Sequence, residues 1–169
     1  MALELNPRMA KALKKTNAAR LLDDLHISYE LRSFEVDEDD LSATAAAAAL
    51  GADPDSVFKT LVGRGDKTGI LMACIPAGAE LALKELAQVS GNKSVQLVPL
   101  KEVLPLTGYI RGGCSPLGTK KPYPVFMDTS AILFEHIYVS AGQRGLQFYI
   151  TPDDLIKATG ATLGEITHP

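Results

Sequence analysis

Two adjacent apolar segments, residues 57–64 and 69–76, constrain the fold of this chain more than any other feature. Both have the length of a buried strand and consist mainly of apolar residues. The residues between them, Gly65-Asp66-Lys67-Thr68, form a typical turn sequence, so the pattern predicts a β-hairpin. Because the two strands are apolar along most of their length, we expect them in the centre of a sheet.

Helical and strand patterns alternate through the rest of the chain. Helices are predicted after the N-cap residues Thr16 and Ser42, over residues 80–90, from Pro99, and from Thr151-Pro152 to Gly160. The first of these helices carries an apolar stripe formed by Ala18, Leu21, Leu22 and Leu25. Further strands are predicted over residues 28–34, 95–98, 123–127, 135–140 and 146–150.

The stretch from Pro105 to Pro124 contains four prolines and four glycines, which predicts a long structured loop. The short strands and tight turns that follow it argue against a regular doubly wound sheet. We therefore expect an α/β protein of the mixed α+β kind, in which a mixed sheet is flanked by helices.

Length and composition suit one compact domain over residues 1–169, because 46% of the 169 residues are hydrophobic. Residues 1–15 form a basic lead-in to this domain. The formal charge of -3 does not by itself indicate a nucleic-acid-binding protein. Two cysteines, the lack of a signal-peptide pattern and the absence of a long apolar run favour a cytoplasmic protein that does not enter a membrane.

Lys59 lies inside the first apolar segment, where strand alternation places it on the same face as Val57 and Leu61. One interpretation is an edge strand whose lysine reaches water and discourages aggregation. The other is a partly desolvated ammonium group that binds an anion or a developing negative charge in a pocket. The residues alone leave both open.

A glycine-rich segment, residues 108–118, carries four glycines whose backbone amides could face a ligand. It matches neither the dinucleotide-binding nor the phosphate-loop pattern, so no nucleotide cofactor is indicated. Tight turns remain the alternative explanation. Residues 140–145 form a second small-residue segment, but they lack the spacing of a nucleophile elbow.

Other chemistries receive little support from the sequence. The three histidines are far apart, and no paired Cys or His spacing suggests a metal site. Cys114 is a candidate nucleophile with His136 as its base, although a lone cysteine is more often packed in the core. Asp128 follows a predicted strand and either orients a ligand or caps the turn before Ser130.

Five short motifs together resemble the YbaK-type Cys-tRNA(Pro) deacylases. They are FKTL at 58–61, TGY at 107–109, GGCSPLG at 112–118, IYVS at 137–140 and RG at 144–145. Their order and spacing match over residues 16–165, nearly the whole chain. The resemblance implies the fold of the editing domain inserted in bacterial prolyl-tRNA synthetases, a curved mixed sheet that forms a partly open barrel flanked by helices.

The resemblance also implies a site. Lys59 would be the principal functional residue, and the loop from Gly112 to Pro116 would shape the pocket. The implied substrate-binding residues are Phe34, Phe58, Thr60, Gly112, Gly113, Ser115, Pro116, Asp128, Ser140 and Gly142. This chain departs from similar proteins at Phe34, Cys114 and Ala141, where they tend to have tyrosine, isoleucine and glycine.

The function implied is trans-editing hydrolysis of mischarged Cys-tRNA(Pro) without a cofactor. The substrate cysteine would attack its own ester, while amides of Gly112 and Gly113 meet the oxyanion and Lys59 binds the terminal adenosine or favours the thiolate. The expected partners are aminoacyl-tRNA, held by basic residues, and prolyl-tRNA synthetase; the candidate basic residues are Lys11, Lys14, Lys15, Arg20, Lys120 and Lys121. Two alternatives stay open: a deacylase for another small amino acid, such as Ala-tRNA(Pro), that uses a bound water, and a non-catalytic protein that binds aminoacyl-tRNA or a synthetase.

Overall fold

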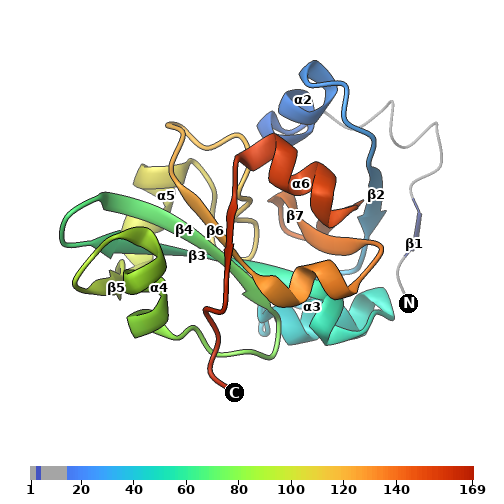
Figure 1. Ribbon diagram of the computed structural model, residues 1–169. Coiled ribbons are helices and arrows are strands. Elements are labelled where there is room, and N and C mark those ends of the chain that lie inside the picture. Colours follow the sequence, from blue (N-terminus) through green and yellow to red (C-terminus); the bar gives the residue numbers. More distant parts are fainter. Residues whose placement is uncertain (1–2, 5–14) are drawn as a thin grey trace.

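The predicted hairpin is present, and it lies in the middle of the sheet (Figure 1). β3 (Val57–Gly65) and β4 (Gly69–Pro76) pair antiparallel from Phe58 opposite Pro76 to Gly65 opposite Gly69. The computed structural model describes residues 3–4 and 15–169. Of the predicted lead-in, therefore, only residues 3–4 and Lys15 can be placed.

The described residues form a nine-stranded sheet in the order β1-β2-β8-β7-β3-β4-β6-β9, with β5 paired to β3 outside this path. The other strands are β1 (Leu3–Glu4), β2 (Glu30–Ser33), β5 (Val95–Leu97), β6 (Val125–Asp128), β7 (Ile137–Gln143), β8 (Leu146–Ile150) and β9 (Thr162–Gly164). Parallel pairs join β3 to β7, β4 to β6 and β6 to β9, whereas the remaining pairs are antiparallel. The predicted mixed α/β fold is thus confirmed.

Three of the five helices in the described residues begin at side-chain caps that the sequence predicts. They are α2 (Asn17–Asp24), α3 (Ala43–Leu50), α4 (Leu83–Ser90), α5 (Leu100–Thr107) and α6 (Pro152–Thr159), with short 3-10 turns η1 (Pro54–Ser56) and η2 (Thr129–Leu133). The side chains of Thr16, Ser42 and Thr151 accept hydrogen bonds from the first turns of α2, α3 and α6. Figure 1 shows α2 and α6 on one side of the molecule and α3 on the other.

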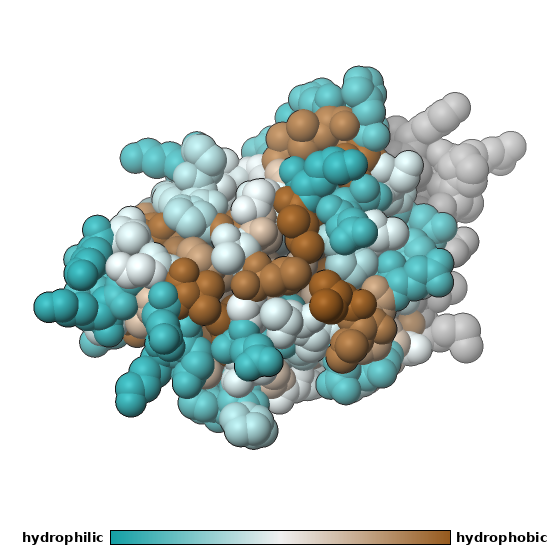
Figure 2. All heavy atoms as spheres, viewed as in Figure 1, coloured by the Kyte–Doolittle hydropathy of each residue, from teal (hydrophilic) through white to brown (hydrophobic). Residues whose placement is uncertain are grey.

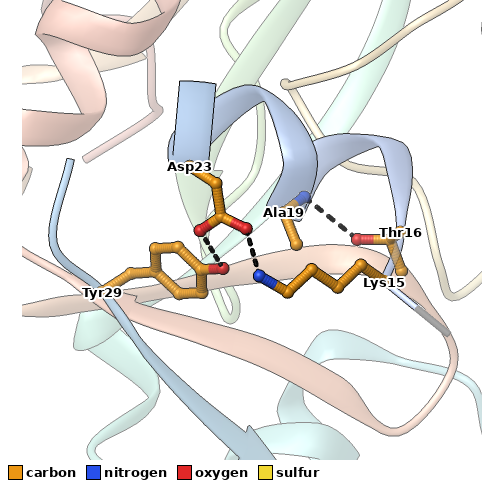
Figure 3. A network of polar contacts seen from close by, with 5 residues as sticks. All are labelled: Lys15, Thr16, Ala19, Asp23 and Tyr29. Atoms are coloured by element: carbon orange, nitrogen blue, oxygen red, sulfur yellow. Dashed lines mark hydrogen bonds and ion pairs between the residues drawn. The ribbon is translucent and has the colours of Figure 1, made fainter. Parts of the chain in front are cut away.

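A polar network fixes the first helix to the strand that follows it (Figure 3). Asp23 accepts hydrogen bonds from the Lys15 ammonium and, at 2.8 Å, from the Tyr29 hydroxyl. The bond from Lys15 lowers the pKa of the Asp23 carboxyl. The predicted apolar stripe on α2 is shorter than expected, because the helix ends at Asp24 and Leu25 is 46% exposed.

The two faces of β3 pack into different parts of the core, as strand alternation requires. Phe58 and Val62 belong to the largest cluster, in which Phe148 is fully buried. Leu61 packs on a second cluster and Val57 on a third. Figure 2 shows that apolar residues also gather across the middle of one face of the molecule, framed by hydrophilic ones.

The proline-rich loop begins later than the sequence predicts. Pro105 lies inside α5, and the helix ends at Gly108, whose backbone has a φ of 85° and whose N–H donates to the Leu104 carbonyl at 2.8 Å. A proline beyond the first turn lacks the N–H that would bond to the carbonyl four residues earlier and crowds that carbonyl, and α5 ends two residues after Pro105. Residues 108–124 contain no strand, and β6 starts at Val125.

Candidate functional site

β3 changes its neighbour along one edge, and this change opens the sheet. At its start Val57 and Phe58 pair with β7, and at its end the three residues from Gly63 pair with β5. Between these two pairings, within the described residues, no strand is paired to that edge of β3. The opening lies at residues 59–61, where the sequence places Lys59, because the Val62 carbonyl already accepts from the Val98 N–H.

A cleft of about 970 Å³ occupies this opening. Six consecutive residues, 57–62, line it. Since alternate residues of a strand point to opposite faces, a cleft lined by consecutive residues must run along the strand edge. The small side chains of Ala43, Ala45, Ala46 and Ala49 on α3 line another wall and leave room for a ligand.

Lys59 is half-buried in the cleft, and its Nζ donates to the Ala77 carbonyl at 3.0 Å. Burial lowers the pKa of this ammonium group. Among the described residues no carboxylate lies within ion-pair distance of it. The interpretation of β3 as an edge strand does not fit, because β3 lies between β7 and β4 within the sheet.

The glycine-rich loop contributes to another wall, but only part of it reaches the cleft. Gly112 and Cys114 line the cleft, whereas Ser115 and Pro116 are buried beneath the loop. The Gly113 N–H donates to the Ile110 carbonyl at 2.9 Å, so this amide is occupied within the loop. It is therefore unsuited to the oxyanion role expected of it.

Gly113 is needed where the loop crosses the β7–β8 turn. A Cβ atom at this position would lie 3.0 Å from the Gln143 Cα and 3.2 Å from the Arg144 nitrogen, both of them backbone atoms. Such contacts cannot be relieved by moving a flexible side chain. Gly113 thus allows two backbones to pack closely, whereas Gly112 lines the cleft.

Arg144 holds the rim of the cleft together, a role that the sequence did not predict. Its Nε donates to the Arg111 carbonyl at 2.8 Å, and its Nη1 pairs with Glu38 at 2.8 Å. It thereby joins the β7–β8 turn, the glycine-rich loop and the acidic segment before α3. The only signal in the sequence was the RG pair of the last motif.

The predicted binding residues divide into two groups. Those that line the cleft are Phe34, Phe58, Lys59, Thr60, Gly112 and Ser140. The structure places the others away from the cleft walls; they are Gly113, Ser115, Pro116, Asp128 and Gly142. Gly142 has a φ of 101° and is packed so closely that a Cβ would lie 2.9 Å from the Tyr109 ring.

Asp128 is buried and caps the turn η2, the structural alternative considered for it. It accepts hydrogen bonds from the Ser130 N–H at 3.2 Å and from the Ile166 N–H at 3.1 Å. The Thr167 hydroxyl donates to it at 3.4 Å. This carboxylate connects the end of β6 to the C-terminal segment and does not reach the cleft.

Cys114 is poorly suited to nucleophilic catalysis. Burial raises the pKa of its thiol to about 11. A thiol with such a pKa is ionised only to about one part in ten thousand at neutral pH, and the thiolate is the reactive form. Cys114 lines the cleft, and the raised pKa disfavours it as the reactive group.

The charges around the cleft are mixed in sign. Besides Lys59, the basic residues are Arg111 and Arg144, and the acidic ones are Glu35, Asp37 and Asp40. The part of the chain that the structure describes holds no group of three or more His, Cys, Asp or Glu arranged to bind a metal. Nor does any helix in that part have the length and apolar character to span a membrane.

The chain is similar to known proteins in sequence and in fold. A family profile described as Aminoacyl-tRNA editing domain matches residues 37–158. A protein of Enterococcus faecalis with the provisional name Cys-tRNA(Pro)/Cys-tRNA(Cys) deacylase EbsC is 44% identical over 157 residues, which cover 93% of this chain and 96% of that protein. The uncharacterized protein YwhH of Bacillus subtilis is 28% identical over 77% of this chain and 84% of its own length.

One solved structure carries a related description. It is the crystal structure of a protein provisionally assigned as a trans-editing enzyme for prolyl-tRNA synthetase, and it has a TM-score of 0.78 at 24% identity. The match covers 93% of this chain and 100% of the other chain. It establishes the expected editing-domain fold. From the profile match and the 44% identical relative, the chain belongs to the aminoacyl-tRNA editing domain family.

Proposed function

We propose that this protein is a deacylase that removes cysteine from mischarged Cys-tRNA(Pro). The observation that carries the proposal is the position of Lys59, a half-buried ammonium group at an opening of the sheet beside the glycine-rich loop. The relative from Enterococcus faecalis, whose name refers to the same reaction, supports the choice of substrate. We further propose that the whole chain is one editing domain acting in the cytoplasm.

In the proposed reaction the substrate supplies the nucleophile. The thiol of the esterified cysteine loses its proton, and its sulfur attacks the ester carbonyl carbon. The bond to the 3′ oxygen of the tRNA breaks, the oxygen takes up a proton, and a four-membered thiolactone leaves, which water opens to free cysteine. A thiol with an ordinary pKa of about 8.5 is ionised to a few per cent near neutral pH, so no protein nucleophile is required.

The role proposed for Lys59 is electrostatic. One of its three N–H donors is engaged by the Ala77 carbonyl, which leaves two for a ligand. A half-buried ammonium group without an ion-pair partner among the described residues attracts a ribose oxygen, a phosphate or a thiolate more strongly than a fully exposed lysine does. The protein then acts by orienting the ester and stabilising charge, which requires no further catalytic side chain.

Binding of tRNA is proposed to depend on local basic residues, because the net charge of the chain is -3. Lys120 and Lys121 are exposed just beyond the glycine-rich loop and suit this role best. Lys15 is engaged by Asp23, and Arg20 donates to Asn17 at 3.3 Å, while Lys11 and Lys14 lie outside the described residues. Such binding should weaken steeply with salt, and prolyl-tRNA synthetase is the proposed partner that supplies tRNA identity.

The test is to incubate the purified protein with a panel of mischarged tRNAs and to measure the release of each amino acid. We expect release from Cys-tRNA(Pro), a loss of at least about 100-fold in Lys59→Ala, and retained activity in Cys114→Ser. Absence of cysteine release would refute the proposed function. Release of alanine instead would assign the protein to another editing specificity, and an inactive Cys114→Ser would restore the thiol as a nucleophile.

A further inference from the structure

The backbone N–H and C=O of Thr60 point into the cleft, and hydrogen bonds of neighbouring residues fix this orientation. In an antiparallel pair, the N–H and C=O of each residue point to the same side, and successive residues alternate. The Val62 carbonyl accepts from the Val98 N–H at 3.0 Å, so the backbone N–H and C=O of residue 62 point toward β5. The Val57 carbonyl accepts from the Ala77 N–H at 2.7 Å. The backbone N–H and C=O groups of odd-numbered β3 residues therefore point toward β4.

The partner strand gives an independent check. Met72 lies opposite Val62 in the register of β3 and β4. Its N–H donates to the Pro124 carbonyl at 2.9 Å, so its backbone N–H points away from β3. Residues 62 and 72 therefore form a pair that exchanges no hydrogen bonds. By alternation Thr60 has the same orientation as Val62, with its N–H and C=O directed away from β4.

The side toward which Thr60 points is the open edge of β3. Pairing with β7 ends at Phe58, opposite Val139, and pairing with β5 begins at Gly63, opposite Leu97. Among the described residues, no hydrogen bond to the Thr60 N–H or C=O from that side is found. Thr60, Ser140 within β7 and Leu97 at the end of β5 all line the cleft.

A backbone donor and acceptor that face an opening side by side are available to a ligand with a matching acceptor and donor. In an ordinary sheet this match is a residue of the next strand, which donates its N–H and accepts with its C=O. An aminoacyl ester has the same arrangement, with an α-ammonium donor and a carbonyl acceptor on either side of one Cα. Strand addition of this type is a known means of recognising extended chains, and here one residue would suffice.

We propose that the aminoacyl group of the substrate binds to the open edge of β3 as a one-residue strand. Its α-ammonium donates to the Thr60 carbonyl, and the Thr60 N–H donates to its ester carbonyl oxygen. The second contact strengthens as negative charge develops on that oxygen, so the Thr60 amide supplies the donor that the occupied Gly113 amide cannot. This inference rests on the proposed function, since it specifies how the same cleft holds an aminoacyl ester.

The test uses two stable analogues and calorimetric binding. One is adenosine carrying 3′-amide-linked cysteine, and the other is the same compound without the α-amino group. We expect the wild-type protein to bind the first about 10- to 100-fold more tightly, since a hydrogen bond from a charged donor is lost in the second. Equal affinities, or no binding of either, would overturn the proposal.

Replacing single backbone amides by esters then tests the Thr60 N–H and the Thr60 C=O separately. Replacing the residue at 60 by its α-hydroxy analogue removes the N–H, and we expect both analogues to bind about 10-fold more weakly. The same replacement at Leu61 weakens the Thr60 carbonyl as an acceptor and should reduce affinity for the amino-bearing analogue alone. The matched control is the replacement at Gly63, outside the cleft lining, which should alter stability but not affinity.

These outcomes are separable from those of the proposed function. If the analogue preferences hold but Cys-tRNA(Pro) is not hydrolysed, the function is refuted and the binding mode stands. If hydrolysis proceeds but the replacement at 60 has no more effect on affinity than the one at Gly63, the binding mode is refuted alone. Circular dichroism establishes that each variant is folded, and the comparison of analogues on wild-type protein needs no variant.

Discussion

Substitution of Asp128 tests whether its carboxylate has a structural or a catalytic role. Its Oδ1 accepts from the Ile166 N–H and the Thr167 hydroxyl, and its Oδ2 accepts from the Ser130 N–H. In Asp128→Asn one of these oxygens becomes an NH₂ group, which faces at least one N–H donor. Either the Ser130 or the Ile166 amide then loses its acceptor, and the remaining bonds lose the charge that strengthens them.

The expected cost follows from burial of these groups. Ile166 is fully buried, so water cannot replace a lost acceptor at its N–H. An unsatisfied buried donor costs about 1–3 kcal/mol, so we expect Asp128→Asn to lower the free energy of unfolding by about 2 kcal/mol. For a domain of this size that corresponds to a decrease in Tm of about 4–8 °C.

The assay combines urea unfolding, followed by circular dichroism, with deacylation of Cys-tRNA(Pro) well below the Tm. We expect the stability to fall while kcat/KM stays within about threefold of wild type, because Asp128 does not reach the cleft. An unchanged Tm together with a kcat/KM reduced about 100-fold would contradict this expectation. The carboxylate would then belong to the site, as the family resemblance implied.

Three further substitutions or modifications test the walls of the cleft. Gly113→Ala should lower the free energy of unfolding by about 1–3 kcal/mol, because the added Cβ meets backbone atoms. Gly78→Ala is the control and should not lower it, because its Cβ would have its nearest neighbour at 3.9 Å. Equal urea midpoints for the two variants would contradict this prediction. Arg144→Ala should raise the KM about 5- to 10-fold with less than about 1 kcal/mol lost in stability, since its ion pair is exposed but its bond to the loop is not replaced. Alkylation of Cys114 by iodoacetamide should accelerate about 100-fold from pH 7.5 to 9.5, since the thiol pKa of about 11 keeps the thiolate fraction rising throughout; a plateau near pH 9 would indicate an ordinary thiol.

The fold could be predicted to a large extent from local patterns. The hairpin of β3 and β4, the caps at Thr16, Ser42 and Thr151, and the class of the fold all follow from periodicity and turn chemistry, which act over a few residues. Element ends were less accurate, as Pro105 within α5 illustrates. The unpredicted strand β9 lies beside β6 only because of pairing between residues far apart in the sequence.

The sequence by itself determined that Lys59 lies within an apolar strand and that a glycine-rich loop follows α5. Only the tertiary structure decided what surrounds them, because β7 and β5 reach the same edge of β3 from positions distant along the chain. The gap between those two strands creates the cleft and leaves the Thr60 backbone open to it. Asp128 shows the converse, since a carboxylate that could have served a ligand is instead held by the Ile166 amide, which no local pattern places beside it.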